Sequence, residues 1–151
     1  MYGNDLIINR QIDLMTDNLL KGVGLGTQDL ASPKNLLIGG PVNPGSVFVL
    51  HSSEKTWEST LKIKNEISLS TSKDTLEDIA INQTPDEYLI TLGYSGWTGG
   101  QLDKELAENA WITAPGDFNV IFRTEPKDQI LAVSEILGFD ITMVSPEFGN
   151  A

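Results

Sequence analysis

Short apolar runs bounded by glycine, proline or polar residues predict most of the strands of this chain. The clearest runs are Ser46–Leu50 (SVFVL) and Tyr88–Leu92 (YLITL). Apolar and polar residues alternate on both sides of Lys64–Asn65, which predicts an antiparallel hairpin of Glu58–Ile63 with Glu66–Ser70. The other predicted strands are Leu6–Arg10, Asn35–Gly40, Trp111–Ala114, Phe118–Phe122 and Phe139–Val144.

Apolar residues that recur every three or four positions predict helices between these strands. One helix follows Ser72, a residue type that caps helix N-termini, and ends at Thr84–Pro85. The last helix begins at Pro126 and ends at Gly138. The other two predicted helices are Ile12–Leu20 and Gln101–Asn109, and the predicted connections include Lys21–Lys34 and the glycine-rich Gly93–Gly100.

The order of these elements mixes strands and helices without strict alternation. Two predicted hairpins, one around Lys64–Asn65 and one around Pro115–Gly116, require antiparallel pairs. This pattern favours an α+β fold over a doubly wound parallel sheet. The length of 151 residues fits one domain, residues 1–151, and no internal repeat or linker divides it.

The composition excludes several kinds of site. The chain has no cysteine, so disulfides, thiolate metal sites and cysteine nucleophiles are absent. A single histidine, His51, cannot build the usual zinc site, and no calcium-loop motif occurs, so we expect no metal. The segment Gly22–Gly26 lacks the spacing of a dinucleotide-binding loop, and we expect no cofactor.

The charge and the N-terminal segment limit location and partners. The 21 acidic and 10 basic side chains give a net charge of −11, and the lysines do not cluster, so direct nucleic-acid binding is unfavourable. No apolar run is long enough to span a bilayer, and the first ten residues lack the pattern of a secretory signal. We therefore expect a cytoplasmic protein without membrane contacts.

Two candidate sites need reactive side chains to meet. The segment Gly93–Gly96 precedes a predicted helix and resembles a nucleophile elbow, which makes Ser95 a candidate nucleophile with His51 as its base. The fifth position of that motif is Trp97 where glycine is required, and a glycine-rich turn explains the segment equally well. Ser70 and Ser72 precede a helix N-terminus that can hold an anion, although a simple helix cap is the alternative.

Aromatic residues mark the remaining candidates. Trp57 and Trp97 supply large contact areas for a ligand or a partner, and Trp97 lies among glycines that leave it accessible. Trp111 could mark such a surface too, but core packing is the default interpretation for it, because it begins an apolar predicted strand. The complete set of tentative ligand- or partner-binding residues is His51, Trp57, Ser70, Ser72, Tyr94, Ser95, Trp97 and Gln101.

Several segments together resemble the AlgH/YqgE family of bacterial proteins. They are Leu6–Arg10 (LIINR), Gly39–Val42 (GGPV), Phe48–His51 (FVLH), Ser68–Asp74 (SLSTSKD), Leu92–Trp97 (LGYSGW), Gly100–Leu102 (GQL), Glu105–Leu106 and Asn109–Trp111 (NAW). The resemblance extends from about Leu6 to Phe122. It implies a mixed α+β fold with a largely antiparallel, bifurcated or partly barrel-like sheet flanked by helices. Members are often labelled as transcriptional regulators, but the resemblance carries no catalytic residue to this chain.

The sequence departs from the family pattern in two places. Family members usually have roughly thirty more residues before the segment that matches Leu6–Arg10, including two strands, and a proline where this chain has Gln11. If those strands belong to the sheet, their absence leaves an open edge. We therefore expect self-association through such an edge.

These observations favour a binding or regulatory module that contacts a protein partner or a small ligand. Regulation of transcription would then be indirect. The alternatives are a hydrolase that uses Ser95 with His51 and a regulator that binds DNA directly.

Overall fold

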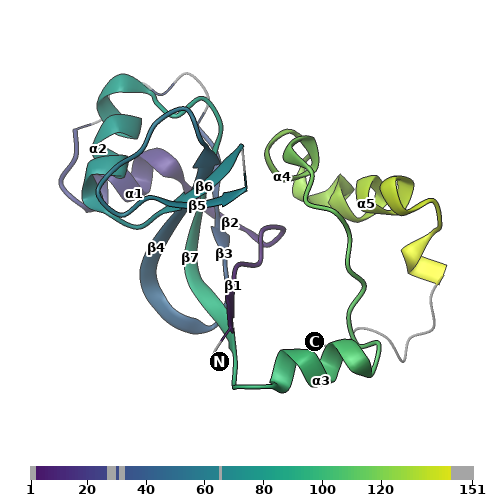
Figure 1. Ribbon diagram of the computed structural model, residues 1–151. Coiled ribbons are helices and arrows are strands. Elements are labelled where there is room, and N and C mark those ends of the chain that lie inside the picture. The colour runs from purple at the N-terminus through teal and green to yellow at the C-terminus, as the bar shows by residue number, and fades with distance from the viewer. Residues whose placement is uncertain (1–2, 27–29, 31–32, 65, 144–151) are drawn as a thin grey trace.

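The computed structural model describes residues 3–26, 30, 33–64 and 66–143 and shows an α+β fold around one branched sheet (Figure 1). The strand order is β2-β3-β7-β4-β6-β5, and β1 pairs with the far half of β7. Only β3 and β7 run parallel, so the sheet is largely antiparallel, as predicted, and it remains open. Its strands are β1 (Gly3–Asp5), β2 (Gln11–Met15), β3 (Asn35–Ile38), β4 (Val42–Ser52), β5 (Leu61–Lys64), β6 (Ile67–Ser70) and β7 (Tyr88–Trp97).

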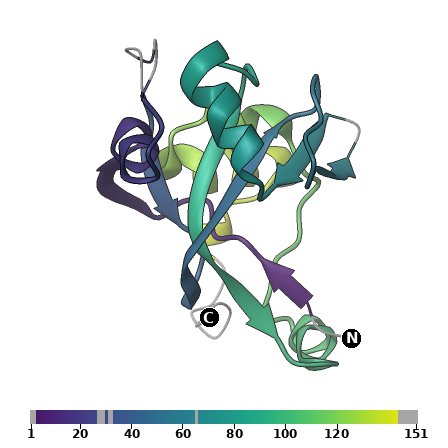
Figure 2. The same cartoon turned by 90° about the vertical axis from the view of Figure 1, so that its left-hand side faces the viewer.

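Helices cover both faces of this sheet. Figure 2 is viewed from the side of α1 (Thr16–Gly22) and α2 (Lys73–Asn82), and α4 (Phe118–Arg123) and α5 (Gln129–Leu137) lie behind the strands. The short helix α3 (Gln101–Ala107) stands apart at the end of β7 (Figure 1). Two 3₁₀ turns, η1 (Pro126–Asp128) and η2 (Ile141–Met143), flank α5.

Alternation along β4 divides the core between the two faces. Val49 packs with α2 residues in one cluster, whereas Leu50 packs with Phe122 of α4 in the other. His51 therefore points to the α2 face, and Ser52 points to the α4 face. This alternation places two polar groups on opposite sides of the sheet.

Three glycines, Gly39, Gly40 and Gly93, allow the chain to cross itself closely beside β3. A Cβ on Gly40 would lie 2.2 Å from the Tyr94 carbonyl carbon, and one on Gly39 would lie 2.4 Å from the Gly93 carbonyl oxygen. Gly93 has φ +71°, a value that favours glycine. The segments GGPV and LGYSGW thus meet in space, although 49 residues (43–91) separate them in the sequence.

The predicted secondary structure of the N-terminal segment is wrong. Leu6–Arg10 is not a strand, and the predicted helix Ile12–Leu20 is divided into β2 and α1. Met15 pairs with Asn35 in the antiparallel ladder, so tertiary pairing overrides the helical spacing of the apolar residues. The helix begins one residue later, where that ladder ends.

The glycine-rich segment and the C-terminal third also differ from the prediction. Strand β7 continues through Gly93 to Trp97, so no turn occurs where the nucleophile elbow was predicted. Residues 111–114 are not a strand, and Phe118–Phe122 lies in α4 because Asp117 accepts a 3.0 Å hydrogen bond from the Val120 N–H and caps a helix. The predicted strand Phe139–Val144 is also absent up to Met143, and Val144 lies outside the described residues.

The predicted hairpin, the α2 helix and the last helix are confirmed. Strand β5 pairs antiparallel with β6, although it begins at Leu61, and Asn65 of the predicted turn is not described. Strand β5 is a sheet edge, but it has four residues, two lysines and an irregular register. These features protect edges against pairing. Self-association through an edge stays a prediction.

Candidate functional site

A buried histidine connects the end of β4 to the turn before α2. The His51 side chain is 0% exposed. Its Nδ1 lies 2.8 Å from the Ser52 carbonyl oxygen, and its Nε2 lies 2.8 Å from the Ser70 Oγ. Ser70, also 0% exposed, lies 2.7 Å from the Thr60 Oγ1. The single histidine is thus held at both ring nitrogens.

These contacts determine the direction of the hydrogen bonds. A carbonyl oxygen can only accept, so Nδ1 carries a hydrogen; in the neutral ring Nε2 then accepts, and the Ser70 hydroxyl donates to it. The Thr60 hydroxyl then donates to Ser70 and accepts from the Trp57 N–H at 2.7 Å. One continuous chain of donors runs from the backbone of Trp57 to the Ser52 carbonyl.

Trp57 and Ser72 join the same cluster. The Trp57 ring lies edge-on to His51 with centroids 5.1 Å apart, and its Nε1–H donates to Asp78 at 2.6 Å. The Ser59 Oγ accepts from the Ser72 N–H at 2.8 Å and donates to the Ser72 Oγ at 2.6 Å. Four predicted site residues therefore converge: His51, Trp57, Ser70 and Ser72.

The other four predicted residues lie along β7 and α3. Tyr94 packs against Phe48 with ring centroids 5.8 Å apart. The indoles of Trp97 and Trp111 pack edge to face at 5.7 Å, and both donate to Glu105 Oε2, at 3.3 and 2.6 Å. Gln101 donates to Glu105 Oε1 at 3.0 Å. Trp97 and Gln101 thus belong to a clamp that holds α3, which we call the α3 clamp (Trp97, Gln101, Glu105 and Trp111).

The structure separates Ser95 from His51 and contradicts their pairing as nucleophile and base. His51 pairs with Tyr88 in the sheet, and Ser95 lies seven residues further along β7. At about 3.3 Å per residue this is roughly 23 Å, far beyond hydrogen-bond reach. The Ser95 Oγ instead donates to the Gly39 carbonyl at 3.4 Å.

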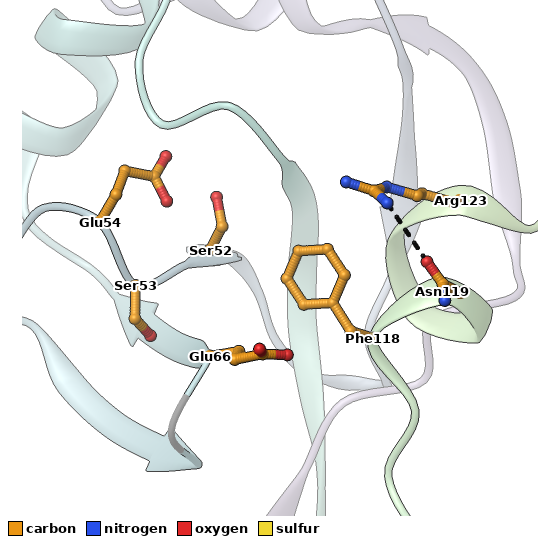
Figure 3. A pocket seen from close by; sticks show the side chains of 7 residues that line it. All are labelled: Ser52, Ser53, Glu54, Glu66, Phe118, Asn119 and Arg123. Carbon is orange, nitrogen blue, oxygen red and sulfur yellow. Dashed lines mark hydrogen bonds between the residues drawn. The ribbon is translucent and has the colours of Figure 1, made fainter.

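A cleft of about 540 Å³ opens on the opposite face of the sheet, against α4. In Figure 3 the ends of β4 and β6 form one wall, and α4 forms the other. A smaller hollow of about 250 Å³ shares Glu66 and Phe118 with it. The cleft is lined by Ser52, Ser53, Glu54, Glu66, Phe118, Asn119 and Arg123.

Both charge signs face this cleft. Burial alone would raise the pKa of Glu54, but hydrogen bonds from Ser52 and the Asp86 N–H lower it overall, so Glu54 is a carboxylate. Arg123 donates from Nε to Glu87 at 3.0 Å and lies over the Phe118 ring at 5.3 Å. Its guanidinium remains largely exposed, so part of it is available to an anion.

The sequence did not indicate the cleft residues. Residues 118–123 lie more than fifty residues beyond Glu66, and a strand at 118–122, as predicted, would have placed Phe118 and Asn119 on opposite faces. An arginine one turn after an asparagine in a short helix is the only local signal. Among the described residues, no three acidic or histidine side chains are grouped to hold a metal, and no helix is long and apolar enough to cross a membrane.

Comparison with known proteins decides the family. A family model described as AlgH-like matches residues 4–142. The chain belongs to the AlgH-like family. A UPF0301 protein of Azoarcus sp. strain BH72 is 41% identical over 147 residues, which cover 97% of this chain and 78% of that protein. One from Shewanella oneidensis strain MR-1 is 36% identical over 150 residues, covering 97% and 80%.

Solved structures of similar proteins agree with this AlgH-like fold. The solution structure of the AlgH protein from Pseudomonas aeruginosa has a TM-score of 0.78 at 35% identity, covering 99% of this chain and 80% of that one. A crystal structure of a Corynebacterium diphtheriae protein has a TM-score of 0.60 at 19% identity, covering 78% and 62%, and supports the fold alone. The family label UPF0301 names no activity.

The structure gives a structural role to several of the segments that carry the AlgH resemblance. GGPV and LGYSGW form the close backbone crossing, and the residues around Gln101, Glu105 and Trp111 form the α3 clamp. Hydrogen bonding from the Trp111 indole lowers the pKa of the Glu105 carboxyl against the smaller opposing effect of desolvation, and Gln101 and Trp97 add to the lowering. The clamp therefore depends on an ionised Glu105.

We expect acid to loosen the α3 clamp. Because the folded-state pKa of Glu105 is lowered, its stabilisation is complete above the unfolded pKa of about 4.3 and is lost as the pH falls below it. In a Trp57→Phe background, fluorescence of Trp97 and Trp111 should shift to longer wavelength between pH 7 and pH 3. The shift should be absent from Glu105→Gln and retained in Glu108→Gln. An unchanged transition in Glu105→Gln would contradict the clamp.

Proposed function

We propose that this AlgH-like protein is a binding module whose ligand site is the cleft between the sheet and α4. The cleft is the observation that carries the proposal: side chains from three separate segments line one hollow of ligand size. A cytoplasmic location, as predicted from the sequence, fits this role.

The arrangement of charge favours a small ligand that carries both an ammonium and a carboxylate group. Glu54 and Glu66 lie on the sheet wall and accept N–H donors, whereas Arg123 lies on the α4 wall and donates to carboxylates (Figure 3). Phe118 lies between them and offers an apolar surface. Amino acids and short peptides have this pattern of groups.

Any regulation of transcription would then pass through ligand binding and not through DNA. The net charge of −11 opposes contact with phosphates, and the cleft itself carries more carboxylates than cations. A ligand that bridges the two walls would fix α4 relative to the sheet, which offers a physical route to a partner surface.

A screen of amino acids and dipeptides by ¹H–¹⁵N NMR tests this function. A ligand should shift amide signals of Ser53, Glu66 and Asn119, and Arg123→Ala and Glu66→Gln should each weaken binding by about tenfold, the cost of one charge-assisted contact. Glu77→Gln, on the exposed side of α2, is the matched control and should bind normally. No cleft shift at millimolar concentration of any compound would refute the proposal.

A further inference from the structure

A second constellation lies on the α2 face, away from the cleft. Ser70 ends strand β6 and begins the turn into α2, and its Oγ lies 2.8 Å from Nε2 of His51. The Ser52 carbonyl holds the His51 Nδ1–H, so Nε2 presents its lone pair to the serine hydroxyl. A serine hydroxyl that donates to an oriented imidazole is the arrangement that activates serine nucleophiles.

Two backbone amides beside Ser70 converge on one oxygen. The N–H groups of Thr71 and Ser72 both donate to the Ser59 Oγ, each at 2.8 Å. The N–H of the residue after the nucleophile is a recurrent oxyanion donor at a strand–turn–helix corner. A substrate oxygen placed where the Ser59 hydroxyl lies would accept from both amides.

We propose that Ser70 and His51, with the amides of Thr71 and Ser72, form a latent acyl-transfer site for ester or thioester substrates. Residues 55–60, which we call the latch, cover it. Ser59 fills the oxyanion position, Thr60 bonds to the Ser70 hydroxyl at 2.7 Å, and Trp57 closes over His51. The site becomes competent when the latch moves away.

The chemistry balances with water as the second substrate. The Ser70 Oγ attacks the acyl carbon while its proton passes to His51 Nε2, and the carbonyl oxygen, now negative, accepts from the two amides. The bond to the leaving alcohol or thiol breaks as His51 returns the proton to it. Water then attacks acyl-Ser70 by the same steps, releasing the carboxylic acid and free Ser70.

The latch is fastened mainly by polar contacts that can exchange with water. Asp78 of α2 accepts from both the Lys55 ammonium and the Trp57 indole, and Asp74 accepts from the Glu58 N–H at 3.0 Å. Lys55, Thr56 and Glu58 are exposed, and Trp57 belongs to neither core cluster. Loss of the Asp78 contacts should therefore release the latch without unfolding the sheet.

Labelling with a fluorophosphonate, followed by peptide mass mapping, tests the site. We expect one adduct, at Ser70, formed slowly in the wild-type chain and about tenfold faster or more in Asp78→Asn, because a charged anchor is lost. Glu77→Gln, also on α2, should label at the wild-type rate. Ser70→Ala and His51→Gln should not label, and p-nitrophenyl acetate turnover by Asp78→Asn should disappear with Ser70→Ala.

Several outcomes would overturn the proposal. The first is an Asp78→Asn protein that is folded by circular dichroism and forms no adduct. The second is an adduct on Ser59 or Ser72. The third is labelling that persists at full rate in folded His51→Gln. The cleft is tested separately, since Arg123→Ala should leave the labelling rate of Ser70 unchanged. If no ligand binds in the cleft, the labelling of Ser70 therefore still tests the acyl-transfer site.

Discussion

Replacing Gly40 by alanine should prevent stable folding. The added Cβ would lie 2.2 Å from the Tyr94 carbonyl carbon and 2.3 Å from the Ser95 nitrogen, and both are backbone atoms of β7 that cannot rotate away. Moving the two segments apart would break the adjoining pairing of β3 with β7 and the 2.9 Å hydrogen bond from the Gly39 N–H to the Leu92 carbonyl. We expect a loss of about 4 kcal/mol or more in the free energy of unfolding.

Gly45→Ala is the matched control for this prediction. Gly45 lies five residues further along, in β4, but an added Cβ there meets no atom within 4 Å, and its backbone lies outside the conformations that favour glycine. Urea unfolding followed by circular dichroism should place Gly45→Ala within about 0.5 kcal/mol of wild type. A folded Gly40→Ala protein of near wild-type stability would show that the crossing of GGPV and LGYSGW is looser than described.

Local patterns predicted the elements whose partners are close in sequence. The β5–β6 hairpin and α2 follow from alternation, a capping position at Ser72 and the Thr84–Pro85 stop, all within a few residues of the element itself. Residues 118–122 were misread because FNVIF has strong strand propensity, whereas the determining feature is the cap from Asp117. Strand β2 was misread because its partner, β3, lies twenty residues away.

The candidate sites show the same limit. The sequence named His51 and Ser70 separately, but it paired the single histidine with Ser95, because Gly93–Gly96 resembles a nucleophile elbow. The register of β4 against β6 decides the pairing, because it places Val49 opposite Ser70 and thereby directs His51 and Ser70 to one face. Registers between strands twenty residues apart cannot be read from one sequence, and the cleft at α4 depends on them as well.

His51→Ala should cause the second large loss of stability. The substitution removes the side-chain partner of the Ser52 carbonyl and one of the two partners of the buried Ser70 hydroxyl, and it opens a cavity beside Trp57. An unsatisfied buried polar group costs about 1–3 kcal/mol, and the cavity adds to this, so we expect about 3–5 kcal/mol in the free energy of unfolding.

The comparison of three variants separates these causes. His51→Gln retains an amide that can form a hydrogen bond with either Ser70 or the Ser52 carbonyl. It should therefore lose about half as much free energy of unfolding as His51→Ala. Lys62→Ala, on the exposed edge strand, should stay within about 0.5 kcal/mol of wild type. The urea midpoint should shift while the slope of unfolding free energy against urea concentration stays constant, because the surface exposed on unfolding is nearly unchanged. Equal stability of His51→Ala and Lys62→Ala would mean that water replaces the ring, and that the donor chain from Trp57 to Ser52 does not hold the latch closed.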